Sequence, residues 1–582
     1  MSLLTKHKKL VLILIVASIL RFYGLSKVPV SLFGDELDVG YHAYSVLTTS
    51  KDYSGNAWPL HFHSLAEWRT PLYLYSAIPS VAFFGISPLG VRLPAAIFGV
   101  LGVLGIYLLV KELGKCVTNR SSNSIESFAL LSALILAFSP WHIQYSRAAF
   151  EVTQLLAFLL FGLYFFFKSL NDGKYLWLSV VLLTFTPWIY STAKLFTPVL
   201  LLFLFVVWRK EILSMAKKYL VAAVLAGLVV GVPIACSSLF GGGSQRFSYI
   251  SVFSDPTLEP EIGTDRLMDG LVREELVLGF QPSIADRFFH NKVEFWSTRI
   301  VANIFKAVST DFLFLNGDPN LRHSIEGMGQ FYRIEFIALI FGLVLFFTNF
   351  KSHKIKWLIT FWIIFGILPS AITRNGGNHA TRLILILPPL VILMAFGLVE
   401  CFSKLKNLRL LFVFGYLIAF GIGFIYYQHN YWVHNPWSSE RWWHSGYKEA
   451  IQSIKDIDDN YDRVVISMAG EPAWIFFAGW YEYPPDKWHA EFPVGNDIEV
   501  EGFGKISHTG KYYFGPVSEA KGIYGLGDII DNKTLYLAVA KEIGANLIRE
   551  PERTPGNLEL VKAISYPSGE PAYYLFSGLK ND

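Results

Sequence analysis

Two carboxylates stand just after the first apolar run of the chain, in the segment SLFGDELDVGYHAYS, and they are Asp35 and Glu36. Carboxylates at a membrane boundary are costly to bury and usually face water, so a solvated loop is the plain alternative. Here aromatic residues such as Phe33 and Tyr41 flank the pair. A carboxylate beside aromatic walls is well placed to take a proton from a hydroxyl as a general base. The segment therefore predicts a catalytic site that contains Asp35 and Glu36.

A second acidic position follows in the segment SPWHIQYSRAAFE. On one continuous helix, Arg147 and Glu151 are four residues apart and share a face, so an ordinary intrahelical ion pair is the plain alternative. If this segment lies on the same side of the membrane as Asp35, the two residues join the site. Glu151 is then a further catalytic acid and Arg147 a cation for a phosphate group.

Other cations and imidazoles occur in segments that we assign to the same face. The further candidates for binding a phosphate are Arg69, Lys194, Arg374 and Arg382. The segment HFHSLAEWRTP also supplies His61, His63 and Glu67, which could ligate a divalent metal, although an H-x-H pair is more often solvated. The segments GDPNLRHSIEG and TRNGGNHATR add Asp318, Arg322, His323 and His379. Together these residues predict a pocket of mixed charge at the membrane surface.

The type of donor follows from the motifs that the sequence lacks. There is no G-x-x-x-x-G-K-[ST] loop and no strand-G-x-G-x-x-G-helix unit for a nucleotide phosphate. The run GVLGVLG is better explained by small residues at a helix-packing face. Because nucleotides are scarce outside the cell, a donor carried on a membrane lipid phosphate fits the predicted pocket better.

The composition defines the elements that must position these side chains. Of the 582 residues, 53% are hydrophobic and only 16% are charged, against about a quarter charged in soluble proteins. The formal net charge of +4 is too small to indicate a nucleic-acid partner. Three widely spaced cysteines give no disulfide framework. The chain is therefore expected to be a polytopic membrane protein.

Apolar runs of about 17 to 25 residues are needed to cross a hydrocarbon layer of about 30 Å. We expect eleven spans, at 9–25, 89–112, 126–143, 149–168, 174–190, 194–209, 216–236, 333–349, 356–373, 382–402 and 407–427. A further apolar run, 71–86, is shorter and carries Pro71 and Pro79, so we expect it to lie in the interface. With this count the loops rich in Lys and Arg fall on the cytoplasmic side, as the positive-inside rule requires.

The same count predicts the topology and the domains. The N-terminus is cytoplasmic, and the loops 26–88 and 237–332 face outward from the plasma membrane. Residues 1–430 form the membrane domain. Residues 431–582 combine a helical pattern in GYKEAIQSIKDI with strand patterns in DRVVISMA and LELVKAISYPSGEPAYYLFSG. They predict a small extracytoplasmic α/β domain.

An Asp-Glu pair after the first helix and an S-R-x-x-x-[DE] element after the third resemble the polyprenyl-phosphate-sugar-dependent glycosyltransferases of the GT-C superfamily. The resemblance is to the family 39 (protein O-mannosyltransferase) group and the lipid A aminoarabinose transferases. It covers roughly residues 8–430 and is strongest over 30–155, in RTPLYLYSAIPSVAFFG, VRLPAAIFGVLGVLGIYLLVKELG and LILAFSPWHIQYSRAAFE.

The resemblance implies a role for several positions. Asp35 matches the catalytic base, with Glu36 adjacent, and Arg147 matches the arginine of the second element. Glu151 matches an acidic position where many relatives have Asp. Glu67 falls where aminoarabinose transferases keep a metal-binding acid, whereas mannosyltransferases have a His-Pro-Pro motif there and this chain continues with Arg69-Thr70-Pro71. A bound divalent metal is therefore left open, and no other cofactor is implied.

Both lines of reasoning lead to the same reaction. A sugar moves from a polyprenyl-phosphate-linked donor to a hydroxyl acceptor on a protein, a lipid or a glycan, by direct displacement with inversion. Two alternatives stay open. A transporter or flippase of lipid-linked sugars would carry charges in the middle of its spans. A non-catalytic glycan-assembly protein would not need Asp35.

Overall fold

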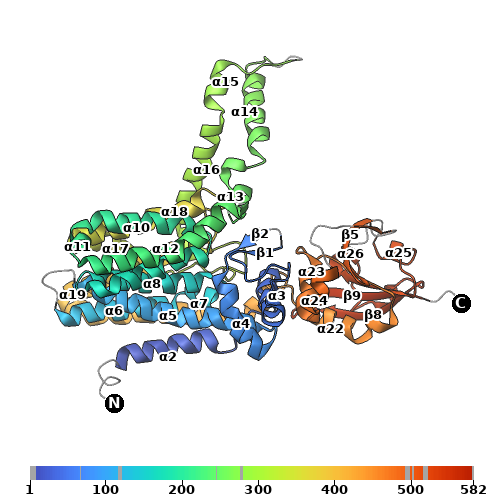
Figure 1. Ribbon diagram of the computed structural model, residues 1–582. Helices are drawn as coiled ribbons and strands as arrows, with labels where there is room; N and C mark the ends of the chain where they lie inside the picture. The colour runs from blue at the N-terminus through green and yellow to red at the C-terminus, as the bar shows by residue number, and fades with distance from the viewer. Residues whose placement is uncertain are drawn as a thin grey trace.

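The computed structural model describes residues 8–65, 67–115, 121–243, 245–275, 279–491, 498–500, 504–515 and 522–579. A bundle of long helices forms one end of the molecule and an α/β domain the other (Figure 1). The helix α3 (Gly34–Thr49) and the hairpin β1 (Phe62–Ser64) and β2 (Glu67–Arg69) lie between the two. The candidate residues of the first loop are therefore placed at the junction of both parts.

The bundle consists mostly of apolar helices that run roughly parallel in Figure 1. Its helices are α2 (Lys8–Phe22), α5 (Pro88–Lys115), α6 (Ser122–Phe138), α8 (Val152–Ser169), α9 (Leu176–Phe185), α10 (Ala193–Val207), α12 (Lys217–Phe240), α17 (Glu335–Asn349), α18 (His353–Ala371), α19 (Leu387–Lys404) and α20 (Arg409–His429).

The protein has six helices in the described residues that are long and apolar enough to cross a membrane, or seven if a bent pair counts as one. Three further apolar helices are shorter: α10, α17 and α4 (Leu72–Phe84), which covers the run expected to be interfacial. The fold is therefore that of a multi-pass membrane protein, as expected from the composition. The count of eleven spans and the direction of the chain stay predictions.

The expected span 126–143 is broken. Helix α6 ends at Phe138, and α7 (Pro140–Ser146) continues at an angle of 60° to it. Pro140 has no N–H to donate, and Ser139 caps the new helix by accepting a hydrogen bond from the backbone N–H of His142. The break turns the chain across the end of the bundle, so that the segment after it lies beside the first loop.

Two helices show which surface of the bundle is suited to lipid. Only 11% of the apolar window of α12 and 6% of that of α20 is buried inside the protein. Val229 on α12 and Ile425 on α20 are 74% and 68% exposed. Apolar side chains exposed along a whole helix are stable in a bilayer and unstable in water.

The C-terminal domain has the predicted α/β character. Its seven-stranded sheet has the order β4-β5-β6-β3-β7-β9-β8, in which β3 pairs in parallel with β6 and β7 and the other pairings are antiparallel. The strands are β3 (Arg463–Ile466), β4 (Ile498–Val500), β5 (Gly504–Thr509), β6 (Tyr512–Phe514), β7 (Thr534–Val539), β8 (Leu558–Ser565) and β9 (Pro571–Gly578). The expected helix and hairpin are α22 (Tyr447–Ile457) and β8–β9.

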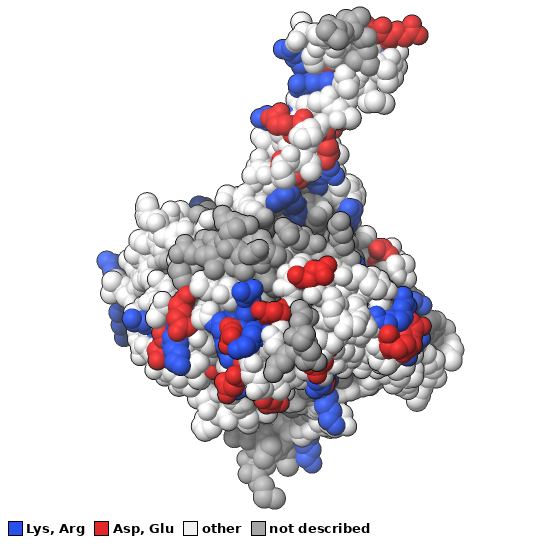
Figure 2. Space-filling model, turned by 90° about the vertical axis from the view of Figure 1, so that its right-hand side faces the viewer, with Lys and Arg blue, Asp and Glu red and all other residues white. Residues whose placement is uncertain are grey.

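The α-helices that follow α22 in this domain are α23 (Ala473–Tyr481), α24 (Pro485–Glu491), α25 (Ile523–Leu526) and α26 (Ala540–Ile543), and the short α21 (Asn435–Ser438) precedes it. On the face of the domain that points away from the bundle, basic and acidic side chains are interspersed (Figure 2).

The C-terminal domain and the first loop share one hydrophobic core, in which Leu37 of α3 packs with Phe477 of α23 and Trp488 of α24. The backbones of α3 and α23 approach so closely that a Cβ added at Gly479 would come within 2.8 Å of the Leu37 side chain. Burial of such large apolar side chains contributes about 1.5 to 3 kcal/mol each. Helix α3 is therefore held in place by the C-terminal domain as well as by the bundle.

The long loop 237–332 contains a helical arm that projects away from the bundle, toward the top of both Figures 1 and 2. Its helices are α13 (Gln245–Ile250), α14 (Leu258–Val272), α15 (Ile284–Phe289) and α16 (Lys292–Ala307). Of the three cysteines, Cys236 and Cys401 are free thiols, and Cys116 lies outside the described residues.

Candidate active site

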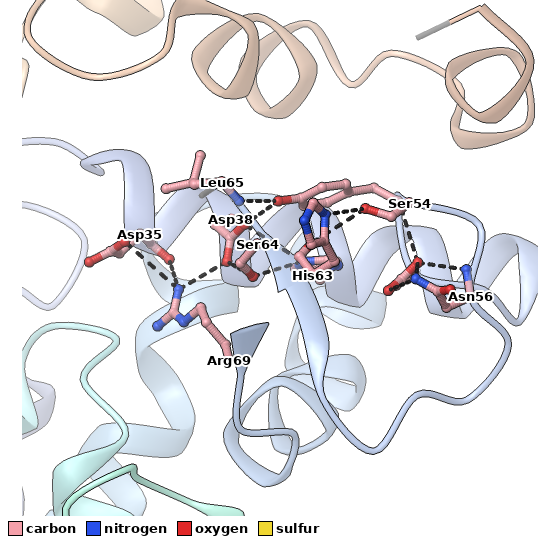
Figure 3. Close-up of polar contacts among 11 residues, drawn as sticks. Asp35, Asp38, Ser54, Asn56, His63, Ser64, Leu65 and Arg69 are labelled. Atoms are coloured by element: carbon pink, nitrogen blue, oxygen red, sulfur yellow. Dashed lines mark hydrogen bonds and ion pairs between the residues drawn. The ribbon is translucent and has the colours of Figure 1, made fainter. Parts of the chain in front are cut away.

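Asp35 lies in the first turn of α3, where the unpaired N–H groups of a helix favour a carboxylate. Its side chain is 51% exposed, which leaves the carboxylate accessible to a substrate. Arg69 holds the residue on one side: its Nη1 donates to the Asp35 carbonyl at 3.1 Å and lies 4.0 Å from the carboxylate Oδ1 (Figure 3). Asp35 is thus anchored through its backbone and open at its reactive end, as a general base must be.

Arg69 joins three carboxylates. It lies buried in β2, and besides Asp35 it binds Oδ2 of Asp38 at 2.9 Å and Oε2 of Glu151 at 3.5 Å. Burial by itself lowers the pKa of Arg69, but the charges of Glu151, Asp35 and Asp38 outweigh it and raise the pKa above its ordinary value. The guanidinium therefore stays charged and sets the spacing of the acids. Because the Arg69 guanidinium already binds these carboxylates, it is not free to bind a phosphate as well.

Asp38 is a member of this site that the sequence analysis missed. Its fully buried carboxylate accepts a hydrogen bond from the Tyr53 hydroxyl at 2.7 Å. It also accepts hydrogen bonds from the Ser64 hydroxyl at 2.8 Å and from Arg69 at 2.9 Å (Figure 3). Burial raises the pKa of Asp38 above its ordinary value, against the opposing effect of Arg69. The sequence could have indicated Asp38, because it follows Asp35 by three residues in GDELD and this spacing puts both acids on one face of a helix.

The structure separates Glu36 from Asp35, contrary to the expectation that both serve the reaction. Glu36 is fully buried and forms two hydrogen bonds with Arg92 of α5, at 2.8 Å and 2.7 Å. It also accepts the backbone N–H of Ala149 at 2.8 Å. A carboxylate with these partners ties α3 to α5 and to the chain between α7 and α8. We therefore reinterpret Glu36 as a residue that holds the site together.

The expected pairing of Arg147 with Glu151 on one helix is wrong. Helix α7 ends at Ser146 and α8 begins at Val152, so the two residues do not share a helical face. Glu151 points to Nη2 of Arg69 instead, whereas Asp35 lies near Nη1 of the same guanidinium. The break therefore places Glu151 in the site and removes Arg147 from it.

Arg147 is buried, and all three of its guanidinium nitrogens have partners. Nε donates to the Tyr431 hydroxyl at 2.7 Å. Nη1 and Nη2 donate to backbone carbonyls in the last turn of α2 and in the segment that follows it, at Leu20, Arg21, Tyr23, Gly24 and Val28. With these bonds Arg147 fixes the chain that leads into α3, and the geometry does not support the expected contact with a donor phosphate.

A largely apolar cavity of about 590 Å³ lies among α10, α12, α13 and the ends of α18 and α19. Apolar side chains such as Leu201, Ile234 and Phe247 line its walls. Its polar lining includes three cations, Lys194, Arg246 and Arg382. A cavity with an apolar wall and several cations fits an amphipathic anion.

Arg246 of α13 is the second residue that the sequence analysis missed, because nothing in the long loop marks it beyond its charge. Its Nη1 binds Oε1 of Glu67 at 2.6 Å. Glu67 stands two residues before Arg69 in β2. Strand β2 thus connects the cations of the cavity to the carboxylates around Asp35.

The proposed metal ligands of the first loop do not converge. Glu67 is engaged with Arg246. His61 uses both ring nitrogens, Nδ1 with the Ser237 hydroxyl at 2.6 Å and Nε2 with Nζ of Lys194 at 2.9 Å. Burial and the nearby Lys194 lower the pKa of His61 to about 4, so it is neutral at pH 7. His63 faces elsewhere, toward Ser54 (Figure 3). These three residues do not fit a metal site.

The remaining predicted cations lie in the link between α18 and α19. Arg382 lines the cavity and donates from Nη1 to the Thr373 hydroxyl at 2.8 Å and to the Arg374 carbonyl at 3.0 Å. Arg374 itself donates to the carbonyl of Tyr249 and is not part of the cavity lining. The link therefore contributes Arg382 to the cavity, with Arg374 supporting α13.

The C-terminal domain reaches the site through Glu471, in the loop after β3. Its Oε2 accepts the backbone N–H of Gly34 at 2.7 Å, next to Asp35, and its Oε1 pairs with Nη1 of Arg322 at 2.6 Å. Oε2 also lies 3.4 Å from Nε2 of His444. Burial alone would raise the pKa of Glu471, but the hydrogen bond with His444 and the charge of Arg322 lower it to about 2. The start of α3 is thus held by a charged residue of another domain.

The comparisons with known proteins agree with this architecture. Residues 69–235 match the family described as dolichyl-phosphate-mannose-protein mannosyltransferase. The fold is that of the GT-C glycosyltransferases, as the resemblance in sequence implied. No curated protein matches the sequence.

Among solved structures, ArnT from Cupriavidus metallidurans bound to undecaprenyl phosphate is similar, with a TM-score of 0.50 and 10% identity over 98% of each chain. The oligosaccharyltransferase of Archaeoglobus fulgidus has a TM-score of 0.46 and 13% identity, over 81% of this chain and 63% of that one. The present chain thus spans less than two thirds of the length of that enzyme. A mycobacterial arabinofuranosyltransferase, AftD, has a TM-score of 0.39 and 14% identity over 99% of this chain and 42% of the other.

Proposed function

We propose that the protein is a membrane glycosyltransferase that moves a sugar from a polyprenyl-phosphate-linked donor to an acceptor hydroxyl at the outer face of the plasma membrane. One observation carries this proposal. An apolar cavity with Lys194, Arg246 and Arg382 in its lining is joined through Glu67 and β2 to an exposed carboxylate at the start of a helix. A lipid phosphate matches the cavity, and the carboxylate is suited to activate a hydroxyl.

The reaction that we propose is a single displacement. The Asp35 carboxylate takes the proton of the acceptor hydroxyl while its oxygen attacks the anomeric carbon of the donor sugar, which inverts. The bond between that carbon and the phosphate oxygen breaks, and polyprenyl phosphate leaves with the electron pair. The charge gained by the phosphate is stabilised by Lys194, Arg246 and Arg382. Arg69 keeps Asp35 in place through its hydrogen bond to the Asp35 carbonyl, and Glu151 binds the other end of the same guanidinium.

The donor part of the proposal has support from outside the chain, since the ArnT structure with the same fold holds undecaprenyl phosphate. The matched family description names a polyprenol-linked sugar, dolichyl-phosphate-mannose. Neither determines the sugar that this protein transfers.

The C-terminal domain is our candidate for the acceptor side. A cleft of about 900 Å³ lies at the carboxyl ends of the parallel strands β3 and β7, lined among others by Arg441, His444 and Tyr566. Ligands of parallel sheets commonly bind at this edge. The wall of the cleft includes Gly470, and the next residue, Glu471, accepts the backbone N–H of Gly34 at the start of α3. An acceptor on a protein, a lipid or a glycan would thus be held next to Asp35.

The transporter alternative has less support in the geometry. A substrate path through the membrane needs charged side chains facing it near mid-span. The fully buried Arg21, Arg92 and Glu335, three charged residues of the described bundle, lie near the ends of α2, α5 and α17. They fix helix ends and do not outline a path.

The test is turnover by the purified protein in lipid nanodiscs. Synthetic polyprenyl phosphates that carry different labelled sugars are supplied with a membrane and cell-wall extract as acceptor source, and transfer of label and release of polyprenyl phosphate are followed. We expect release with one class of donor sugar. Absence of release with every donor, from a protein that still melts cooperatively, would contradict the proposal. Movement of the intact donor between leaflets would instead favour a flippase.

A further inference from the structure

Three potential metal ligands meet where the end of the long loop contacts the link between α18 and α19. Among the residues that the structure describes, one group of three could hold a metal ion, and its members are Asp318, His323 and His379. Their ligand atoms all lie within 4.8 Å of one another. Asp318 and His323 belong to the end of the long loop, and His379 to the link between α18 and α19. Segments about 60 residues apart in the chain are thus brought to one point.

The neighbours of these side chains orient them as metal ligands are oriented. His323 approaches the Thr381 hydroxyl with Nδ1 at 3.3 Å, which leaves its Nε2 for another partner. Asp318 accepts the backbone N–H groups of Asn320 at 2.9 Å and Ala380 at 2.8 Å, one on each oxygen. Such outer hydrogen bonds fix the ring and the carboxylate of a metal ligand and are a regular part of metal sites.

His379 supplies a second, independent observation. Its Nδ1 is buried and has no hydrogen-bond partner. A buried polar atom without a partner is costly, and in native structures it commonly indicates a missing water, ion or ligand. The ring centres of His379 and His323 lie 5.1 Å apart with their planes tilted by 36°, and their ligand atoms are close enough for one ion to contact both.

We propose that Asp318, His323 and His379 bind one divalent transition metal ion of the zinc class. Two imidazoles and one carboxylate match the ligands of zinc and cobalt, whereas magnesium and calcium prefer oxygen ligands alone. Three protein ligands leave a fourth position of a tetrahedral ion for water or an anion. The site is different from the one expected from His61, His63 and Glu67, whose side chains are engaged elsewhere.

The ion would tie the end of the long loop to the link that carries Arg382. These two segments are already connected by the hydrogen bond that the Ala380 N–H donates to Asp318. Arg382 follows three residues after His379 and lines the cavity that we assign to the donor. Metal binding would therefore hold Arg382 in position, as a structural support of the phosphate-binding end. The proposal of a metal ion does not itself depend on the proposed function.

Cobalt binding tests the site directly. The full-length protein in detergent is stripped with a chelator, loaded with Co²⁺ and freed of excess metal, and bound cobalt and its visible absorption are measured. We expect about one ion per chain with the intense absorption of a tetrahedral site, and loss of both in the variants His379→Gln and Asp318→Asn. The matched control is His63→Gln, which should keep the ion. Metal retained by both site variants, or no cobalt on the wild type, would overturn the proposal.

Thermal unfolding distinguishes a variant that has lost the metal site from one that does not fold. We expect Zn²⁺ to raise the melting temperature of the stripped wild type and of His63→Gln, and to leave that of a folded His379→Gln or Asp318→Asn variant unchanged. An equal rise in a site variant would contradict the assignment. No sugar donor is needed in either measurement, so a failure here would not bear on the glycosyltransferase proposal.

Discussion

Glu471→Gln tests whether the C-terminal domain holds the start of α3. The carboxylate pairs with Arg322 at 2.6 Å and accepts the Gly34 N–H at 2.7 Å. Its pKa is lowered from 4.5 to about 2, which at about 1.4 kcal/mol per unit corresponds to about 3 kcal/mol at neutral pH. A glutamine still accepts the Gly34 hydrogen bond, so we expect a loss of about 2 kcal/mol in the free energy of unfolding.

The difference in stability between wild type and Glu471→Gln should depend on pH in a defined direction. A carboxyl whose folded pKa is lowered stabilises the protein fully above its unfolded pKa, and this stabilisation is lost as the pH falls through the folded pKa. Wild type and Glu471→Gln should therefore differ by a constant amount from pH 7 to about pH 5, and converge as the pH falls from about 4.5 to about 2. Unfolding in detergent is followed by tryptophan fluorescence, with protease resistance of the C-terminal domain as a second readout.

The control is Glu449→Gln in the same domain, where the exposed carboxylate pairs with Lys562. An exposed pair contributes about 0 to 1 kcal/mol, so this variant should behave almost as the wild type. Equal stability of Glu471→Gln and wild type at pH 7, or a difference that persists unchanged at the lowest pH, would refute the reasoning.

Two further changes separate support from substrate contact. Glu36→Gln leaves the charge of Arg92 buried without its partner. We therefore expect a loss of about 3 kcal/mol in the free energy of unfolding, measured by denaturant titration. A variant as stable as wild type would contradict the supporting role of Glu36. Arg246→Gln removes a charge from the cavity lining, and we expect binding of undecaprenyl phosphate to weaken about 10-fold to 100-fold in a fluorescence titration. The control is Arg299→Gln, an exposed residue of α16 outside the lining. Equal weakening in both variants would argue against the cavity as the phosphate site.

The sequence was sufficient for the features that depend on local pattern. The apolar runs predicted a multi-pass membrane protein, and the alternation in LELVKAISYPSGEPAYYLFSG predicted the hairpin of β8 and β9. The expected topology placed Glu151 on the same side of the membrane as Asp35, and the structure brings both to Arg69. The spacing in SRAAFE predicted that Arg147 and Glu151 share a helical face, which is wrong because the helix breaks between them.

What the sequence did not reveal depends on contacts between distant segments. Nothing around Arg246 distinguishes it from the other charged residues of the long loop until α13 folds against β2 and pairs it with Glu67. Glu36 and Asp35 are adjacent in sequence, yet consecutive residues of a helix point about 100° apart, so one is buried against Arg92 and the other faces solvent. Glu471 is 437 residues from Gly34, and only the docking of the C-terminal domain makes it part of the site.

The central claim is that Asp35 is the base of a sugar transfer from a lipid phosphate. The most direct test compares wild type and Asp35→Asn in the nanodisc assay, with undecaprenyl-phosphate binding and melting temperature measured on the same samples. The account predicts a loss of at least about 100-fold in polyprenyl phosphate release, with lipid binding and melting temperature unchanged, because the Asp35 side chain is exposed and lies outside the cavity lining. Equal release by the two proteins would contradict it.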